Sequence, residues 1–392
     1  MPWKGQTMEE IRAEFVRRVL SKEQSKSALC REYNISRPTG DKWIKRYQAG
    51  SLMTNQSRAP HHIPNRTDIG TEEAIIAIRT AYPALGAKKL KRMLENQGKH
   101  APAYSTINAI LHRNGLITKE ASVAATPHIR FEKERANDMW QADFKGHFAI
   151  KDGTRCHPLT ILDDHSRFSL CIDAKENERC AETQESFTRA FERYGLPKTL
   201  LCDNGNPWGT QQSVGYTKFE VWLMDLGILT KHGRIRHPQT QGKEERFNGT
   251  LKRELLKYQE FDNIIHAQMA FDKYREFYNY ERPHHALNLG LPVERYSNSE
   301  RKLPQSIQPW DYGSNMLVRT LKHSGYLTIN GQGYFISEAF GKKTVGLVES
   351  TSTKGIFYVL YRQFCIAKVN VDERIVLARK PFIWGENLGT NV

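Results

Sequence analysis

The chain has 392 residues, of which 39% are apolar and 26% are charged, and its formal net charge is +15. This length exceeds one ordinary core, so two to four domains are expected. No apolar run approaches the roughly 18 residues that a membrane-spanning helix needs, and the N-terminus lacks a signal-peptide pattern. Six cysteines without a Cys-x-x-Cys pair indicate a reduced, cytoplasmic chain and argue against a zinc knuckle.

Basic residues are concentrated in the first third of the chain. Residues 1–130 hold 22 Lys and Arg against 11 Asp and Glu. Such a region indicates a polyanionic partner such as DNA, although plain solubility would give the same balance. Helices with the geometry to read a DNA groove are needed to separate these two interpretations.

Three short helices are predicted in residues 1–50. The first follows a capping box formed by Thr7 and Glu10, and the third follows a Ser36 cap. This is a helix-turn-helix pattern, with residues 37–46 as the recognition helix in a major groove. A small helical bundle with a solvated basic face is the alternative. The side chains expected to face DNA are Arg37, Thr39, Lys42 and Arg46.

A linker at residues 51–70 leads to a second three-helix unit at residues 71–119, which resembles a winged-helix or homeodomain module. Thr71, Gly86 and Ser105 mark the expected starts of its helices. Two DNA-binding modules on a flexible tether can follow a longer DNA site than either module alone. The basic side chains expected to face outward toward phosphates are Lys88, Lys89, Lys91 and Arg92.

A second linker at residues 120–135 precedes a change of hydrophobic period from helical to two. Three strands in sequence, followed by alternating helices and strands, predict a mixed α/β sheet of ribonuclease-H-like order over residues 136–300. Residues 310–392 carry short β runs separated by glycine turns, which predicts a small, mostly antiparallel barrel. The central elements are strands at 139–144, 159–163, 168–173, 199–202 and 228–231 and helices at 182–194, 218–226, 241–258 and 264–280.

Three carboxylates lie at positions where the local sequence pattern does not favour a charged side chain. Asp143 interrupts the first apolar strand, Asp203 ends the fourth, and Glu245 lies in the first turn of a later helix. Each has an ordinary explanation as a strand-edge acid, a turn former or a partner of the helix dipole. If the first and fourth strands are neighbours, however, Asp143 and Asp203 point at the same spot. Glu245 shares a helix face with Asn248 and Lys252, and this face would look across the sheet.

Carboxylates gathered at one point repel unless a cation joins them. Two of them about 4 Å apart repel by about 4 kcal/mol at an effective dielectric constant of about 20, so without a cation one would stay protonated. All-oxygen ligation favours Mg²⁺ or Mn²⁺ over zinc, and two such ions can assist both oxygens of a displacement at phosphorus. Ser166, beside an Asp-His pair, lacks the glycine pattern of a nucleophile elbow. No P-loop or dinucleotide fingerprint is present.

These residues resemble the integrase-type catalytic core that bacterial insertion-sequence transposases share with retroviral integrases. The resemblance covers about residues 135–300, and the helical front and barrel-like tail match such transposases loosely. Because the DNA-binding and catalytic parts share one chain, it is similar to the single-reading-frame type. The matching stretches are residues 140–144, 163–167, 202–205, 237–243, 245–248, 278–279 and 282–284.

The resemblance implies that Asp143, Asp203 and Glu245 are the catalytic residues and hold two Mg²⁺ ions, for which Mn²⁺ can substitute. Glu245 takes this role because the family's glutamate stands three residues after the glycine matched by Gly242. The family usually has an apolar residue where this chain has Glu244. DNA contacts are also expected from Asn204, Gln241, Lys243 and Lys252.

The resemblance further implies a DNA transposase that binds the terminal inverted repeats of an insertion sequence. It would hydrolyse the phosphodiester at the element ends and join the 3′-OH to target DNA, as a homodimer or homotetramer at the bacterial nucleoid and without a nucleotide cofactor. The alternatives are a transposase-derived DNA-binding regulator without catalytic activity and a plain nuclease. The 41 residues between Asp203 and Glu245 exceed the usual family gap, and the excess is placed in a loop at 208–218.

Overall fold

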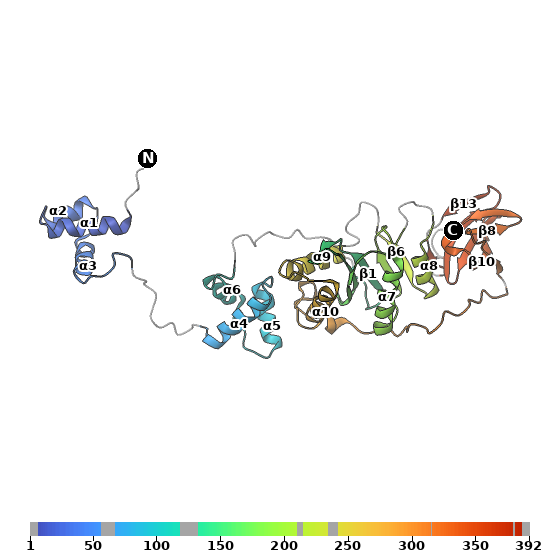
Figure 1. Cartoon of the computed structure of the whole chain (residues 1–392), viewed down its shortest axis with the longest axis horizontal. Helices are drawn as coiled ribbons and strands as arrows, with labels where there is room; N and C mark the ends of the chain where they lie inside the picture. The colour runs from blue at the N-terminus through green and yellow to red at the C-terminus, as the bar shows by residue number, and fades with distance from the viewer. Residues whose placement is uncertain are drawn as a thin grey trace. The chain divides into compact units, whose positions relative to one another are not determined.

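The computed structural model describes residues 7–55, 67–117, 132–209, 215–233, 242–314, 316–378 and 381–385. The chain divides into two compact units, Met1–Arg66 and Thr67–Val392 (Figure 1). No helix in the described ranges is long and apolar enough to cross a membrane.

The first unit contains three short helices around one small apolar core. The capping box between Thr7 and Glu10 is present, and the Ser36 hydroxyl caps the third helix, so both predicted helix starts are confirmed. The third helix approaches the second closely at Gly40, where a Cβ atom would lie 2.9 Å from the Cys30 sulfur. The helices are α1 (Met8–Leu20), α2 (Lys26–Glu32) and α3 (Arg37–Gln48).

A second group of three helices begins the second unit, and two of its three predicted starts are wrong. The first of these helices begins before Thr71 because the Asp68 carboxylate accepts the Thr71 backbone N–H at 2.8 Å and caps the helix there. The last begins after Ala103, without a side-chain cap, so Ser105 lies inside it. The start after Gly86 is confirmed. The helices are α4 (Ile69–Ala81), α5 (Ala87–Asn96) and α6 (Tyr104–Arg113).

The centre of the second unit is a mixed sheet with strand order β2-β3-β1-β5-β6, in which β4 also pairs with β3. Strand β1 is antiparallel to β3 and parallel to β5, and β5 is parallel to β6. The first and fourth predicted strands are therefore neighbours. The strands are β1 (Met139–Phe144), β2 (Phe148–Ala149), β3 (Arg155–Asp163), β4 (Ser169–Lys175), β5 (Thr199–Cys202) and β6 (Leu229–His232).

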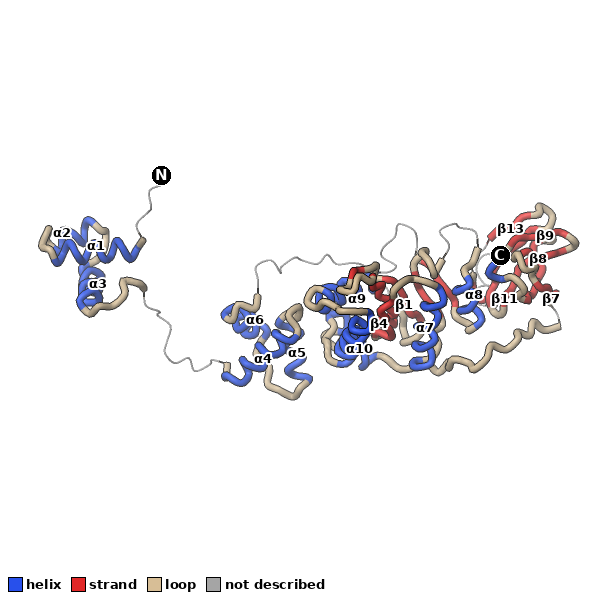
Figure 2. Tube along the Cα trace, in the orientation of Figure 1, coloured by secondary structure: helices blue, strands red, loops and turns tan. Residues whose placement is uncertain are grey.

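Helices cover both faces of this sheet, as the ribonuclease-H-like order predicts (Figure 2). On one face, Trp140 and Ala142 of β1 pack in a core with α7 (Cys180–Tyr194) and α8 (Lys218–Asp225). On the other face lie α9 (Gly242–Leu251) and α10 (Ile264–Tyr280). The helix predicted at 241–258 is not regular throughout, because a π-helical turn at Lys252–Leu256 follows α9.

The C-terminal strands form an open antiparallel sheet in the order β13-β12-β11-β10-β7, with β14 beside β12. The predicted antiparallel character is confirmed, but the predicted closed barrel is not. Strands β8 and β9 pair with each other as a separate hairpin, so no ladder among the described strands joins the two sheet edges. The strands are β7 (Leu317–Thr320), β8 (Tyr326–Ile329), β9 (Gln332–Phe335), β10 (Thr344–Glu349), β11 (Ile356–Tyr361), β12 (Phe364–Asn370), β13 (Ile375–Ala378) and β14 (Phe382–Ile383).

The C-terminal sheet packs against α8 of the central domain. Asp225 of α8 has a side chain that is only 8% exposed. It accepts hydrogen bonds from Lys343 (2.8 Å), from Arg362 (3.1 Å) and from the hydroxyl of Tyr361. A buried carboxylate is stable only when such partners satisfy it, so this contact fixes the tail on the helix that follows Asp203 in the chain.

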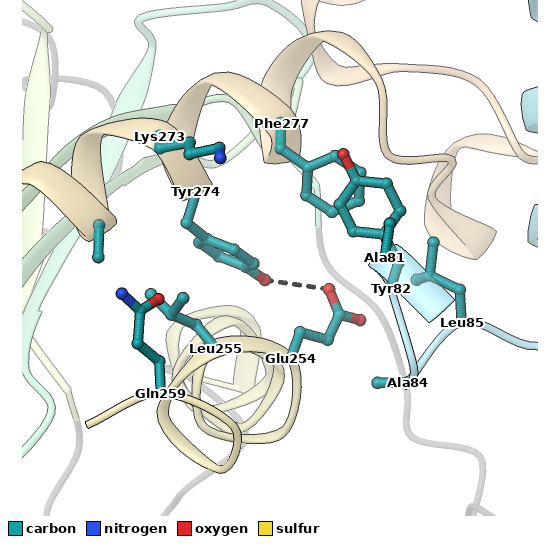
Figure 3. A pocket seen from close by; sticks show the side chains of 11 residues that line it. Ala81, Tyr82, Ala84, Leu85, Glu254, Leu255, Gln259, Lys273, Tyr274 and Phe277 are labelled. Carbon is teal, nitrogen blue, oxygen red and sulfur yellow. Dashed lines mark hydrogen bonds between the residues drawn. The ribbon is translucent and has the colours of Figure 1, made fainter. Parts of the chain in front are cut away.

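The second helical group packs against α10 and the π-helical turn. The rings of Tyr82 and Phe277 stack with centroids 4.0 Å apart, and the Tyr274 hydroxyl donates to Glu254 at 3.1 Å (Figure 3). Glu254 also lies 3.9 Å from the ammonium of Lys89 on α5. This helical group is therefore held by a buried polar contact as well as by aromatic packing.

Candidate active site

Asp143 lies at the end of β1, beneath α9. Its Oδ2 atom accepts a hydrogen bond from the Asn248 side-chain amide at 2.9 Å, and its backbone carbonyl accepts one from the Thr160 hydroxyl at 3.1 Å. The helix face predicted from the spacing of Glu245 and Asn248 therefore reaches the first aspartate through Asn248. Strand β3 contributes the second contact through Thr160, which lies opposite Asp143 in the β1–β3 ladder.

Burial and neighbouring carboxylates together raise the pKa of Asp143. Burial, followed by the negative charge of Asp203 and smaller effects of Glu178 and Glu245, raises this pKa to about 7. The Asn248 hydrogen bond acts in the opposite direction. Without a cation, Asp143 is therefore partly protonated near neutral pH, as expected for converging carboxylates.

Asp203 immediately follows β5, beside β1. Its Oδ1 atom accepts the backbone N–H of Gly205 at 2.9 Å, which forms a tight turn at the end of the strand. Because β1 and β5 are parallel neighbours, Asp143 and Asp203 lie at the same end of the sheet. The ends of strands in α/β sheets are where such folds place ligands.

The two adjacent glutamates of α9 have opposite environments. Glu245 is exposed, whereas Glu244 is 1% exposed and neither of its carboxylate oxygens has a hydrogen-bond partner within 3.5 Å among the described residues. Burial, followed by the charge of Asp143, raises the pKa of Glu244 well above its usual range, and the nearby Thr160 hydroxyl opposes this slightly. Burial therefore disfavours the charged form of Glu244, whereas the Glu245 side chain is accessible to solvent.

The described residues include no group of three His, Cys, Asp or Glu side chains placed to hold a metal ion. The structure brings Asp143 and Asp203 together and places Glu245 close enough to influence the pKa of Asp143. The donor set still fits a hard divalent cation. Two carboxylates converge, and a cation between them would offset their repulsion and lower the raised pKa of Asp143.

The predicted DNA contacts of α3 differ in how accessible they are. Arg37 and Lys42 are exposed. Thr39 is half-buried, with its hydroxyl 2.9 Å from that of Ser36. Arg46 is also half-buried and donates to the Thr54 carbonyl at 3.0 Å. Arg37 and Lys42 therefore have the freer side chains for a DNA partner.

The predicted DNA contacts in the second unit also differ in how accessible they are. Lys88 and Lys252 are exposed, whereas Lys89 and Lys243 have side chains that are 12% and 11% exposed. Burial lowers the pKa of each buried lysine to about 8. Lys243 pairs with a fully buried carboxylate, that of Asp164, at 2.5 Å.

The Asn204 amide donates to the Gly233 carbonyl at 3.1 Å. Gln241 and residues 210–214 of the predicted loop lie outside the described residues.

A cleft of about 720 Å³ with several basic side chains lies near Asp143. Lys145 on its wall follows Asp143 by two residues, and burial followed by the charge of Lys252 lowers the pKa of Lys145. Clustered basic side chains near Asp143 provide a surface for a phosphate backbone. The basic residues of the cleft are Lys145, His147, Lys151, Lys252, Arg253 and Lys257.

Residues 133–238 and 226–292 each match a family described as Integrase core domain, and residues 11–61 match one described as Helix-turn-helix domain. The uncharacterized protein of insertion element IS407 from Burkholderia multivorans is 26% identical over 62% of this chain and 87% of its own length. The IS476 protein of Xanthomonas euvesicatoria is 25% identical over 45% of this chain and 49% of its own. The Gag-Pol polyprotein of baboon endogenous virus is 27% identical over 47% of this chain and 10% of its own length.

Residues 11–61 are therefore similar to helix-turn-helix domains, and residues 133–292 are similar to integrase core domains. Its predicted resemblance to insertion-sequence transposases with an integrase-like core is confirmed. The chain spans about half of the Xanthomonas relative and a tenth of the viral polyprotein. Among solved structures, the HTLV-2 integrase catalytic core domain in complex with magnesium aligns with 41% of this chain and 97% of its own, at 20% identity and a TM-score of 0.32.

Sequence reasoning missed three side chains near the aspartates. Glu178 adds negative charge at Asp143, and its carboxylate lies 2.9 Å from the ring of His157. His232 and Glu220 form a hydrogen-bonded pair behind Asp203. The only signal for this pair in the sequence is a histidine that ends the strand next to β5, and a strand-end histidine alone has no specific meaning.

Proposed function

We propose that this protein is a DNA transposase that cuts and joins DNA at the ends of an insertion sequence. The observation that carries the proposal is the convergence of Asp143 and Asp203 at the ends of adjacent parallel strands, beneath the helix that bears Glu245. An integrase core domain and a helix-turn-helix domain on the same chain support it.

Asp143, Asp203 and Glu245 would hold two Mg²⁺ ions, with Mn²⁺ as a substitute. Such ions supply charge stabilisation at the attacking and leaving oxygens of an in-line displacement at phosphorus. The Asn248 amide fixes the orientation of the Asp143 carboxylate through its 2.9 Å hydrogen bond. The basic cleft holds the phosphate backbone beside these acids.

The proposed reaction has two displacements. Water first attacks the phosphodiester at an element end and releases a 3′-OH. That hydroxyl then attacks a phosphodiester of the target DNA, so one P–O bond forms for each that breaks and no nucleotide cofactor is consumed. Because two ends must be joined, a homodimer or homotetramer would assemble on DNA at the bacterial nucleoid.

We assign recognition of the terminal inverted repeats to the helical regions. Residues 1–50 would place α3 in a major groove, and residues 71–119 would contact an adjacent segment through exposed cations such as Lys88. Residues 136–300 would carry the chemistry, and residues 310–392 would support it from the C-terminal side.

The test is Mg²⁺-dependent cleavage and joining of an end oligonucleotide by the wild type and by Asp143→Asn. The variant is expected to bind DNA with unchanged affinity and to neither cut nor join, because it loses charge without losing size. Equal cutting by both proteins would contradict the proposal. Cutting without joining by the wild type would favour a nuclease.

A catalytically silent DNA-binding regulator is the second candidate. The observation that favours it is the lack, among the described residues, of three ligands grouped for one metal ion. The same assay separates the two functions, because a regulator would bind end DNA specifically and leave it intact at every Mg²⁺ concentration.

The exposed and buried lysines give a further prediction about DNA binding. Lys252→Ala is expected to weaken affinity about threefold to tenfold for all DNA sequences and to lower the slope of log K against log [salt] by about 1, since it removes one phosphate contact. Lys89→Ala is the matched control, because its ammonium faces Glu254. Salt titrations followed by fluorescence anisotropy measure both slopes, and identical slopes for the two variants would contradict the assignment.

A further inference from the structure

The turn that carries Asp203 is tied to the end of β6 by three hydrogen bonds. The backbone N–H of Gly233 donates to the Cys202 carbonyl at 3.0 Å, and the Asn204 amide donates to the Gly233 carbonyl at 3.1 Å. The Nδ1 atom of His232 donates to the Asp203 carbonyl at 2.7 Å. The last bond is a direct side-chain contact to the backbone of a proposed ligand residue.

The opposite side of the His232 ring is held by Glu220 of α8. The Nε2 atom of His232 lies 3.0 Å from Oε1 of Glu220, whose side chain is 6% exposed. The other carboxylate oxygen of Glu220 accepts the backbone N–H of Thr217 at 2.7 Å and the Thr217 hydroxyl at 3.1 Å. The buried carboxylate is thus anchored at the start of α8 while it holds the imidazole.

Each nitrogen of the His232 ring faces an oxygen atom, the Asp203 carbonyl on one side and the Glu220 carboxylate on the other. The chain also leaves space for the ring at Gly209, where a Cβ atom would lie 3.2 Å from Cε1 of His232. Two fixed hydrogen bonds and a fitted space determine the orientation of the imidazole.

We propose that Glu220 and His232 form a positioning pair that fixes the Asp203 turn in the geometry needed to bind a divalent cation. This inference rests on the proposed function, in which Asp203 is a ligand. His232 contacts the Asp203 backbone and not the reacting atoms, so it is a positioning residue. Partners that orient ligand residues typically contribute about 10- to 100-fold to metal affinity.

Two amide substitutions of His232 each keep one of the two hydrogen bonds of the ring and remove the other. In His232→Asn the amide lies near the Nδ1 position and keeps the bond to the Asp203 carbonyl. In His232→Gln it lies near the Nε2 position and keeps only the bond to Glu220. Electron paramagnetic resonance titration with Mn²⁺ alone measures metal affinity without DNA or turnover. His232→Gln is expected to bind Mn²⁺ at least about tenfold more weakly than the wild type, and His232→Asn is expected to lie between them.

Thermal unfolding of each variant reports whether the fold is kept. A purely structural role for His232 would lower stability similarly in both variants and leave Mn²⁺ affinity unchanged, and that result would overturn the inference. If His232→Gln does not fold, Glu220→Gln replaces it, because it removes the charge that holds the ring. It is expected to weaken Mn²⁺ binding by at least about threefold, and unchanged binding would overturn the inference.

The readout also separates this inference from the proposed function. A wild type that binds Mn²⁺ but does not cut end DNA would overturn the function while the Mn²⁺ affinities of the variants still decide the positioning role. A wild type that binds no Mn²⁺ would overturn both.

Discussion

Replacing Glu245 by glutamine is expected to abolish end cleavage and joining, with a loss of at least about 10³-fold in each rate. The change keeps the size of the side chain and removes its charge. Glu245 is exposed, so the fold has little dependence on it, and the loss would come from a weaker hold on the divalent cations. Rates measured with a labelled end oligonucleotide, together with DNA affinity in a gel-shift assay, separate a chemical defect from a binding defect.

Glu244→Gln is the matched control on the preceding residue. Glu244 is buried, and its pKa is raised well above the usual range by burial and by Asp143. Because burial disfavours the charged form of Glu244, an uncharged amide of the same size is expected to keep both rates within about threefold of the wild type. The reverse pattern, in which Glu244→Gln is inactive and Glu245→Gln is active, would identify Glu244 as the ligand.

The central α/β sheet was largely predictable because its elements carry strong local patterns. The bounds of β1, β5 and α10 agree with the sequence prediction at both ends. Their apolar periodicity is bounded by residues that stop a strand or helix, such as Pro283 after α10. The pairing of β1 with β5 was left open by the sequence, and it is this pairing that brings Asp143 to Asp203.

The predictions that failed depend on competition between neighbouring residues. Asp68 and Thr71 are both good helix caps, and the sequence does not show which backbone N–H each will accept. Closure of the C-terminal barrel depends on whether β8 and β9 pair with each other or with the sheet edges, which is a tertiary choice. The buried state of Lys89 likewise follows from packing between elements, because helical periodicity alone places this lysine on an outward face.

Arg282→Met is expected to lower the free energy of unfolding of the second unit by about 3–5 kcal/mol. The side chains of Arg282 and Glu254 are 6% and 9% exposed, and two hydrogen bonds of 2.6 Å join the guanidinium to the carboxylate. Tyr274 and Lys89 complete the surroundings of this carboxylate. Removing the guanidinium leaves a buried charge without its main partner. Urea denaturation followed by tryptophan fluorescence measures the loss.

The control is Arg295→Met, which breaks a half-exposed pair with Glu132 and is expected to cost no more than about 1 kcal/mol. The pH dependence gives a second check. Burial raises the pKa of Glu254, but Arg282, Lys89 and Tyr274 together outweigh burial and hold this pKa below the ordinary 4.5. In the wild type, the stability from Glu254 is therefore complete above that value and is lost as the pH falls through the lowered pKa.

In Arg282→Met, burial has lost its main opposing interaction and raises the pKa of Glu254, so protonation at falling pH relieves the buried charge. The stability difference between wild type and variant should accordingly be largest near neutral pH and shrink as the pH falls toward 4.5. A difference that stays constant over this range would mean that the loss comes from packing of the Arg282 side chain and not from its charge.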